Sequence, residues 1–213
     1  MVLRKLMGVF MVTLLIGAAS FATAGVPDLG LSTASRAYVG PEQLSLFNLP
    51  NGGGSAFTAA FKPAGGGQAD ATITVTLVDG LGAAIENYPF EDVTVNCDDG
   101  VNAIAPCLGG VTADANTDAL GQTQFQTPLA AGGWANANTD VEIAGAALTS
   151  GSVALRMNSA DISGDGAVTL TDVGIFSSIF YGAYSYAADF NNDGLMSLSD
   201  VGLLASGVGG ACP

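Results

Sequence analysis

The sequence predicts a mainly β protein, an antiparallel β-sandwich followed by a short α-helical segment at the C-terminus. Residues 71–78 read ATITVTLV, in which threonine alternates with apolar residues as in a strand with one buried face. Clusters of Gly, Asn and Asp, which turns favour, punctuate the chain up to residue 157. From residue 158 the pattern changes to two acidic, glycine-containing stretches, each followed by apolar residues at helical spacing.

The first 24 residues have the layout of a secretory signal peptide. Two basic residues precede an apolar run, and the small residues 22–24 (ATA) supply a cleavage site before Gly25. The alternative is an uncleaved N-terminal anchor. The run is short for a bilayer span, and no later stretch is long and apolar enough to be one. We therefore expect a mature chain without a membrane span that is secreted or held at the cell surface.

The charge and composition of the chain exclude several kinds of function. The chain has a net charge of −14, and removal of residues 1–24 leaves three basic against nineteen acidic residues, or −16. Such an acidic surface disfavours nucleic acid and anionic membranes as partners. The chain has no histidine, which excludes Ser-His-Asp and Cys-His catalysis and the usual zinc sites. Because no other nucleophile–base pair is evident, we predict that the protein is not an enzyme.

Residues 25–157 predict the β-sandwich itself. The expected strands are residues 43–47, 56–61, 71–78, 83–88, 92–97, 121–126, 141–146 and 152–157. Turn clusters separate them, among them residues 131–133, and residues 25–69 can supply extra edge strands.

Two motifs in this region resemble those of bacterial immunoglobulin-like domains of the invasin and intimin type. They are residues 74–84 (TVTLVDGLGAA), which match a hairpin motif, and residues 116–125 (NTDALGQTQF), which match a turn motif. The first lacks the proline of the family pattern and the second its alanine. The resemblance covers residues 70–157 and implies an immunoglobulin-like sandwich for the domain at residues 25–157.

Two twelve-residue stretches carry the chemistry of the C-terminal segment. Residues 161–172 and 189–200 both fit D-x-[NS]-x-D-G-x-[hydrophobic]-[ST]-x-x-D. Oxygen-bearing side chains at alternate positions can converge on one hard cation, a glycine at the sixth position allows the sharp turn, and a carboxylate at the twelfth closes the shell. The alternative is a pair of ordinary Asp/Asn/Gly turns, but turn chemistry does not require the distal Asp172 and Asp200.

Residues 158–213 resemble a dockerin type I domain, a duplicated calcium-binding module of bacterial extracellular proteins. Like that family, this segment ends each loop in aspartate and follows each loop with one helix. The resemblance implies two calcium ions. All-oxygen donors favour calcium over zinc, and the number of ligands exceeds what the octahedral coordination of magnesium prefers. The implied ligands of the first ion are Asp161, Ser163, Asp165, the carbonyl of Ala167, Thr169 through water, and Asp172. Those of the second are Asp189, Asn191, Asp193, the carbonyl of Leu195, Ser197 through water, and Asp200.

The two loops and their helices should pack together. The apolar positions 170, 173, 176 and 180, and then 198, 201, 204 and 208, each lie on one helical face. In paired loops of this type a short backbone bridge joins the eighth positions, which predicts that Val168 lies beside Met196. Family members that dock to cohesins often carry Lys or Arg after each loop, whereas here no basic residue follows Arg156. A cohesin-like protein, another cell-surface protein and the neighbouring β domain are therefore alternative partners.

Three further features complete the predictions. Cys97 and Cys107 are expected to form a disulfide, which leaves Cys212 to pair between molecules or stay free. A third acidic run, Asp114 to Asp118, lacks the loop glycine and closing carboxylate and predicts a turn. Trp134, the one tryptophan, is expected to pack on a sheet edge, with sugar stacking as the alternative.

The sequence thus predicts an exported, non-catalytic, calcium-binding module protein. Its dockerin-like segment would attach or assemble an immunoglobulin-like domain outside the cell. Two alternatives stay open: a carbohydrate-binding component of a cellulosome-like assembly, and a self-assembling surface or filament subunit.

Overall fold

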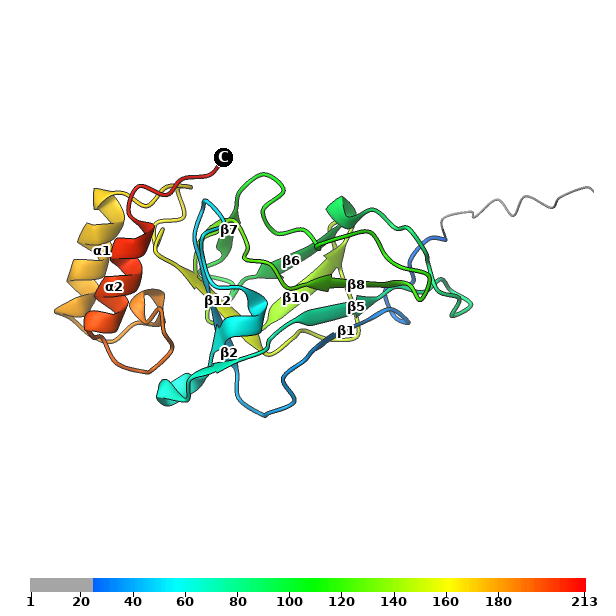
Figure 1. Cartoon of the computed structure of the whole chain (residues 1–213), viewed down its shortest axis with the longest axis horizontal. Helices are drawn as coiled ribbons and strands as arrows, with labels where there is room; N and C mark the ends of the chain where they lie inside the picture. The colour runs from blue at the N-terminus through cyan, green and yellow to red at the C-terminus, as the bar shows by residue number, and fades with distance from the viewer. Residues whose placement is uncertain (1–24) are drawn as a thin grey trace, which may run out of the picture.

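The computed structural model describes residues 25–213, so the predicted signal peptide at residues 1–24 lies outside the described residues. The described chain is mainly β, with several small sheets and two α-helices near the C-terminus (Figure 1). The strands are β1 (Thr33–Arg36), β2 (Leu44–Asn48), β3 (Ala60–Phe61), β4 (Gln68–Ala69), β5 (Ile73–Thr76), β6 (Val93–Cys97), β7 (Ile104–Pro106), β8 (Gln122–Phe125), β9 (Ala131–Gly133), β10 (Thr139–Ile143), β11 (Ala146–Ala147) and β12 (Leu155–Ser159). The helices are α1 (Leu170–Phe180) and α2 (Leu198–Gly207), with 3₁₀ turns η1 (Phe57–Ala59), η2 (Pro63–Gly65), η3 (Phe90–Asp92) and η4 (Tyr186–Ala188).

The strands form four sheets with the orders β1-β5-β8, β11-β10-β6, β12-β2-β3-β4 and β7-β9. Pairing between the named strands is antiparallel except between β2 and β12, which run parallel with Leu44 opposite Leu155. The parallel pair joins segments from the two ends of the β region, and neither segment carries a local signal for it. This pairing was not predicted from the sequence.

The larger of the two hydrophobic cores contains side chains from all four sheets. The alternation that predicted a strand at residues 71–78 is confirmed, because Ile73 and Val75 are fully buried and the intervening Thr74 is half-buried. Val93 and Val95 of β6, and both leucines that face each other across β2 and β12, enter the same core. The period of two in the sequence therefore has its physical origin in one shared apolar interior.

Three segments differ from the structure expected of them. Residues 56–61, expected as one strand, form the 3₁₀ turn η1 followed by the two-residue strand β3. Residues 83–88 form no strand beyond one bridge at Ala84, because Asn87 and Tyr88 donate their backbone N–H groups to Thr117 instead of to a neighbouring strand. Conversely, residues 131–133 (AGG), expected to be a turn, form the fully buried strand β9. Small residues are needed there because a loop of the C-terminal region lies directly against them.

The two cores meet along β2 and just after β12: in β2, Leu46 lies in the larger core and Phe47 in a second one. Leu155 and Met157 point into the larger core, whereas Ala160, which directly follows β12, lies in the second core. The boundary expected between residues 157 and 158 therefore falls inside a strand. The second core contains the buried residues Phe47, Leu49, Ala160, Ile162, Val168, Phe176, Ala187, Ala188, Phe190 and Leu204.

The helical end of the molecule packs on the outer face of β2 (Figure 1). The Phe190 ring lies 5.3 Å from that of Phe47 in β2 and 5.7 Å from that of Phe176 in α1. Half-buried Trp134 also packs against this core, with its ring edge-on to Tyr186 at 6.5 Å. The helices and the sheets are therefore joined by aromatic packing.

Both α-helices begin with a capping box. Thr169 and Asp172 cap α1, and Ser197 and Asp200 cap α2. The apolar stripes are buried only in part, because the first residue of each helix, Leu170 or Leu198, is exposed. Within the described range, neither helix combines the length and hydropathy needed to cross a membrane.

The disulfide differs from the predicted pair. Cys107 is bonded to Cys212, and Cys97 is a buried free thiol at the end of β6. The prediction of a Cys97–Cys107 bond was therefore wrong. It rested on closeness in sequence, whereas the fold brings the C-terminal tail, 105 residues further along the chain, beside Cys107.

Candidate metal-binding loops

Loop 1, residues 161–172, is organised around a fully buried Asp161. One of its carboxylate oxygens accepts backbone N–H bonds from Gly164 and Asp165, at 2.9 and 3.2 Å, and the other accepts one from Gly166 at 2.9 Å. The chain can fold back so sharply because Gly166 has φ +91°, a conformation open to glycine. The first carboxylate of the motif is thus at the centre of the loop.

The last residue of loop 1 closes it. Asp172 is fully buried, and its two oxygens accept backbone N–H bonds from Ser163 at 3.0 Å and Thr169 at 2.8 Å. The second of these bonds also completes the capping box of α1. One aspartate therefore stabilises the helix start and joins it to the beginning of the loop.

Loop 2, residues 189–200, repeats this arrangement. Fully buried Asp189 accepts N–H bonds from Asp193 at 3.0 Å and from Gly194 at 2.9 Å. Fully buried Asp200 accepts bonds from Phe190 at 2.9 Å and Ser197 at 3.0 Å. In both loops the first carboxylate binds the fifth and sixth backbone positions, and the twelfth binds the ninth position and one near the start.

The remaining predicted ligands lie nearer the surface. Asp165 and Asp193 each accept a bond from the backbone N–H two residues further on, at 3.1 and 2.8 Å. The Ser163 hydroxyl donates to Asp161 at 3.2 Å, and the Asn191 side chain donates to Asp193 at 2.9 Å. The structure thus brings the side chains of each loop together, but it joins them to one another by hydrogen bonds.

Two buried carboxyl groups of the loops, one in each loop, have raised pKa values. Burial raises the pKa of the Asp161 carboxyl above its ordinary value, and the nearby Asp172 raises it further. Burial likewise raises the pKa of Asp200, with a contribution from Asp189. No lysine, arginine or histidine occurs in the sequence after Arg156, and Arg156 itself donates to the side-chain amide of Asn192 in loop 2. Buried carboxylates without a positive partner are costly, and a cation would offset that cost.

These residues fit a calcium ion by the type of donor atom and by the lone pairs that remain free on them. Each carboxylate oxygen has two lone pairs, and Asp172 Oδ1 accepts one hydrogen bond, from the N–H of Ser163, so that oxygen keeps a lone pair for a metal contact. Asp172 Oδ2 accepts from both the N–H and the hydroxyl of Thr169. Across residues 25–213, however, no group of three or more acidic, cysteine or histidine side chains is arranged to hold a metal. Serine, asparagine and backbone oxygens would have to complete the shell in each loop.

Two residues next to loop 2 and one within it were missed by sequence reasoning. The side chain of buried Asn158 donates to the backbone carbonyl of Asp189 at 2.7 Å, and Tyr184 donates its hydroxyl to the Asp189 carboxylate at 2.7 Å. Burial, followed by this bond, raises the pKa of Tyr184 to about 12. Asn192 donates to the carbonyl of Phe61 at 3.1 Å. No local motif marks such contacts between distant segments.

The predicted backbone bridge between Val168 and Met196 does not form. Val168 instead donates its N–H to Gly210 at 2.8 Å, and its carbonyl accepts from Gly209 at 3.0 Å. The C-terminal tail thus occupies the hydrogen-bonding edge that was expected to face loop 2. Val168 and Met196 still pack against the same second core through their side chains.

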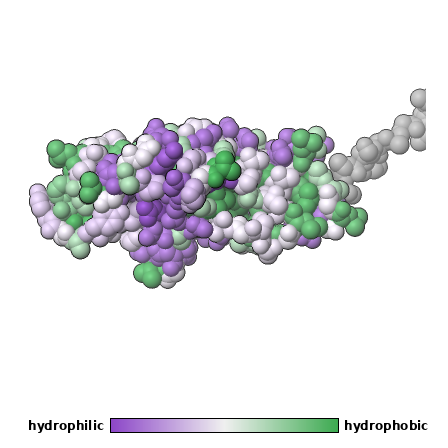
Figure 2. Space-filling model, turned by 90° about the horizontal axis from the view of Figure 1, so that it is seen from below, coloured by the Kyte–Doolittle hydropathy of each residue, from purple (hydrophilic) through white to green (hydrophobic). Residues whose placement is uncertain are grey.

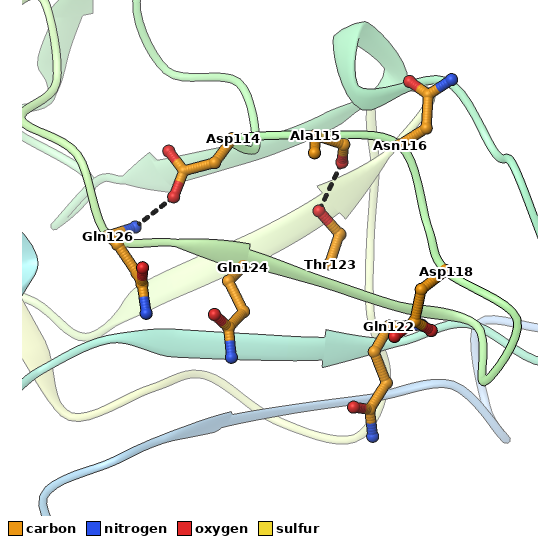
Figure 3. Close-up of a pocket in the computed structure, with 8 residues that line it drawn as sticks. All are labelled: Asp114, Ala115, Asn116, Asp118, Gln122, Thr123, Gln124 and Gln126. Atoms are coloured by element: carbon orange, nitrogen blue, oxygen red, sulfur yellow. Dashed lines mark hydrogen bonds between the residues drawn. The ribbon is translucent and has the colours of Figure 1, made fainter.

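The third acidic run behaves as the predicted turn (Figure 3). Asp114 accepts from the Gln126 backbone at 2.7 Å, whereas Asp118 accepts from the backbone N–H groups of Leu120 and Gln122 in the tight turn that it begins. The labelled side chains are spread along a shallow pocket of about 350 Å³ and do not converge on one point. The same residue types therefore give different structures when they are exposed.

Comparisons with known proteins assign no family. No family model matches the chain, and no curated protein matches it. Among solved structures, the crystal structure of the Lin-41 filamin domain is 12% identical and aligns with 62% of this chain and 95% of that one, with a TM-score of 0.29.

Proposed function

We propose that the protein is an exported, non-catalytic module in which two calcium-loaded loops present a helical surface for attachment outside the cell. One observation carries this proposal: loops 1 and 2 share the same hydrogen-bond pattern around buried first and twelfth aspartates. Two unrelated turns would have no reason to bury and arrange four carboxylates alike. The pattern supports the dockerin-like reading of residues 158–213.

Calcium is the ion that this donor set favours. The donors are hard oxygens from carboxylate, hydroxyl, amide and backbone groups, which suit calcium and do not suit zinc. Asp161, Asp165 and Asp172 would hold one ion, and Asp189, Asp193 and Asp200 the other, with the remaining ligands that the resemblance implies. When bound, each ion would supply the positive charge that the buried carboxylates lack.

The surface for attachment would be the exposed start of the two helices. Leu170 and Leu198 take the tenth position of their loops and are 84% and 81% exposed. Figure 2 shows small hydrophobic groups at the helical end of the molecule, separated by a hydrophilic band from those at the other end. Exposed apolar side chains at matching positions suit a protein partner of either a cohesin-like or another cell-surface kind.

The β region would be the cargo that this segment attaches, and we propose an immunoglobulin-like sandwich for it. The several sheets around one core, and the antiparallel pairing of most strands, support that assignment. A carbohydrate-binding role is the second candidate. It is favoured by a small cleft of about 260 Å³ that half-buried Trp134 lines beside Ser163 of loop 1. Self-assembly through Cys212 loses its support, because that cysteine is bonded within the chain.

Calcium binding to variants tests the proposal. Equilibrium dialysis with radioactive calcium should give about two ions per chain, and Asp193→Ala should lower the number to about one. Asp114→Ala is the matched control, since it removes an aspartate from a similar run that forms a turn. Equal loss of calcium from both variants, or no binding to the unmodified protein, would contradict the proposal.

Attachment is tested separately with the surface variants. Leu170→Asp and Leu198→Asp should abolish calcium-dependent binding to the surface fraction of the producing cell, whereas Leu108→Asp, at a fully exposed position in the β region, should not. Binding that survives both helix substitutions or a calcium chelator would exclude this surface.

A further inference from the structure

Loop 1 lies directly on the β region. The N–H of Gly133 in β9 donates to the backbone carbonyl of Asp161 at 2.7 Å. A Cβ atom placed on the neighbouring Gly132 would overlap the Asp161 carboxylate, so only glycine leaves room for that carboxylate in its observed position. The central residue of loop 1 is thus positioned by a strand that precedes it by about thirty residues in the sequence.

The C-terminal tail lies along the other part of loop 1. Cys212 donates its N–H to the carbonyl of Gly166 at 2.8 Å, and Val168 donates to Gly210 at 2.8 Å. Ala167, between these two residues, forms a β-bridge with the tail as well. The sixth to eighth positions of the loop, which include the implied carbonyl ligand, are therefore fixed by the last residues of the chain.

The Cys107–Cys212 disulfide joins these two supports. Cys107 directly follows β7, and its N–H donates to the carbonyl of Ala130, the residue before β9. The bond therefore connects the β7–β9 sheet, on which Asp161 lies, to the tail that pairs with Gly166. Loop 1 is held between two segments that are covalently linked.

Loop 2 is held in another way. Its hydrogen bonds with the β region involve side chains. They run from Asn192 to Phe61, from Arg156 to Asn192, and from Asn158 to the backbone carbonyl of Asp189. Neither of the bonded cysteines belongs to loop 2 or to its neighbouring residues. The two loops share one internal hydrogen-bond pattern but differ in what surrounds them, which provides an internal control.

We propose that the disulfide and Gly132 are part of the calcium site of loop 1: they hold the loop in its binding conformation, so that disulfide integrity and calcium occupancy of loop 1 stabilise each other. This inference rests on the proposed function in that loop 1 binds calcium. A preorganised loop loses less conformational freedom on binding and so binds more tightly. Linkage is reciprocal, so calcium in loop 1 must in turn favour the closed, disulfide-bonded form.

The affinities of single loops test the proposal in the full mature chain. Asp193→Ala leaves loop 1 as the intact site, and Asp165→Ala leaves loop 2. Adding Cys107→Ser with Cys212→Ser should raise the calcium Kd of loop 1 by about tenfold or more and change that of loop 2 by less than about twofold. With the disulfide intact, Gly132→Ala should weaken loop 1 as well. Gly202→Ala, where an added methyl group meets no atom within 4 Å, is the matched control.

A second measurement leaves all three cysteines in place. Dithiothreitol reduces the disulfide to two thiols and becomes a cyclic disulfide itself, and alkylation followed by mass spectrometry gives the rate. Calcium should slow this reduction several-fold, and Asp165→Ala should remove the effect while Asp193→Ala keeps it. Equal loop 1 affinities with and without the disulfide, or a reduction rate independent of calcium, would overturn the inference and leave calcium binding intact. Absence of calcium binding to the unmodified protein would overturn both.

Discussion

Asp161 and Asp114 begin similar acidic runs but have different surroundings. Asp161 is fully buried beneath β9 and binds three backbone N–H groups of its own loop, whereas Asp114 is exposed and bonds to the backbone of Gln126 and the side chain of Thr127. The difference is explained by the glycine at the sixth position and the distal aspartate. Loop 1 has both of them, and the third acidic run has neither. At the scale of single residues, the sequence therefore distinguished the two loops from the turn.

Cys97 gives a prediction at this scale. Burial raises the pKa of its thiol from 9.0 to about 11, so at pH 8 its reactive thiolate is roughly a hundredfold scarcer than that of an unperturbed cysteine. Iodoacetamide should leave Cys97 unmodified in the native protein and label one thiol per chain after unfolding without reductant. Digestion without reduction should give the Cys107–Cys212 peptide pair. Rapid native labelling, or a Cys97–Cys107 pair, would refute this assignment.

Secondary-structure elements could be predicted from the sequence where the local residue pattern agrees with the tertiary structure. The alternation in β5 and β6, the two loops, and the start of each helix follow from periodicity and capping, which act over a few residues. The parallel pair of β2 and β12, strand β9 and the Cys107–Cys212 bond depend on contacts between segments far apart in sequence. No local property of those residues specifies their partners, so sequence reasoning missed them.

Phe190 tests the packing between these elements. It is fully buried and contacts rings from both β2 and α1, so Phe190→Ala should lower the free energy of unfolding by about 3–5 kcal/mol. Leu108→Ala, at a fully exposed position, should change it by less than about 0.5 kcal/mol. Urea unfolding measures both values. Similar small effects in the two variants would mean that the second core contributes little to the free energy of unfolding.

Removal of calcium should loosen the helical end first. Six aspartates in two short loops repel one another without a cation, so chelation should speed amide exchange in α1 and α2 while β5 and β6 stay protected. Trp134 reports the same event, since it packs against the second core, and its emission should shift to longer wavelength. The variant with both Asp165→Ala and Asp193→Ala should show no response to chelator. Helices that stay protected after chelation of the unmodified protein would contradict this expectation.

At the scale of the whole molecule, the β region and the helical end are continuous. Strand β2 lines both cores, the tail returns to the β7–β9 sheet, and a disulfide fixes that return. The domain boundary expected from the change in composition marks a change of structure type but lies inside strand β12. A bound ion at loop 1 would therefore act on the interface between the two regions as well as on the helices.

Native mass spectrometry of the mature, disulfide-bonded protein, equilibrated with calcium in the presence of equimolar zinc, tests the central claim most directly. Two buried carboxylate pairs with hard oxygen donors and no histidine predict a complex with two calcium ions and no zinc. A protein that binds no calcium under these conditions, or that binds zinc in preference, would contradict the account.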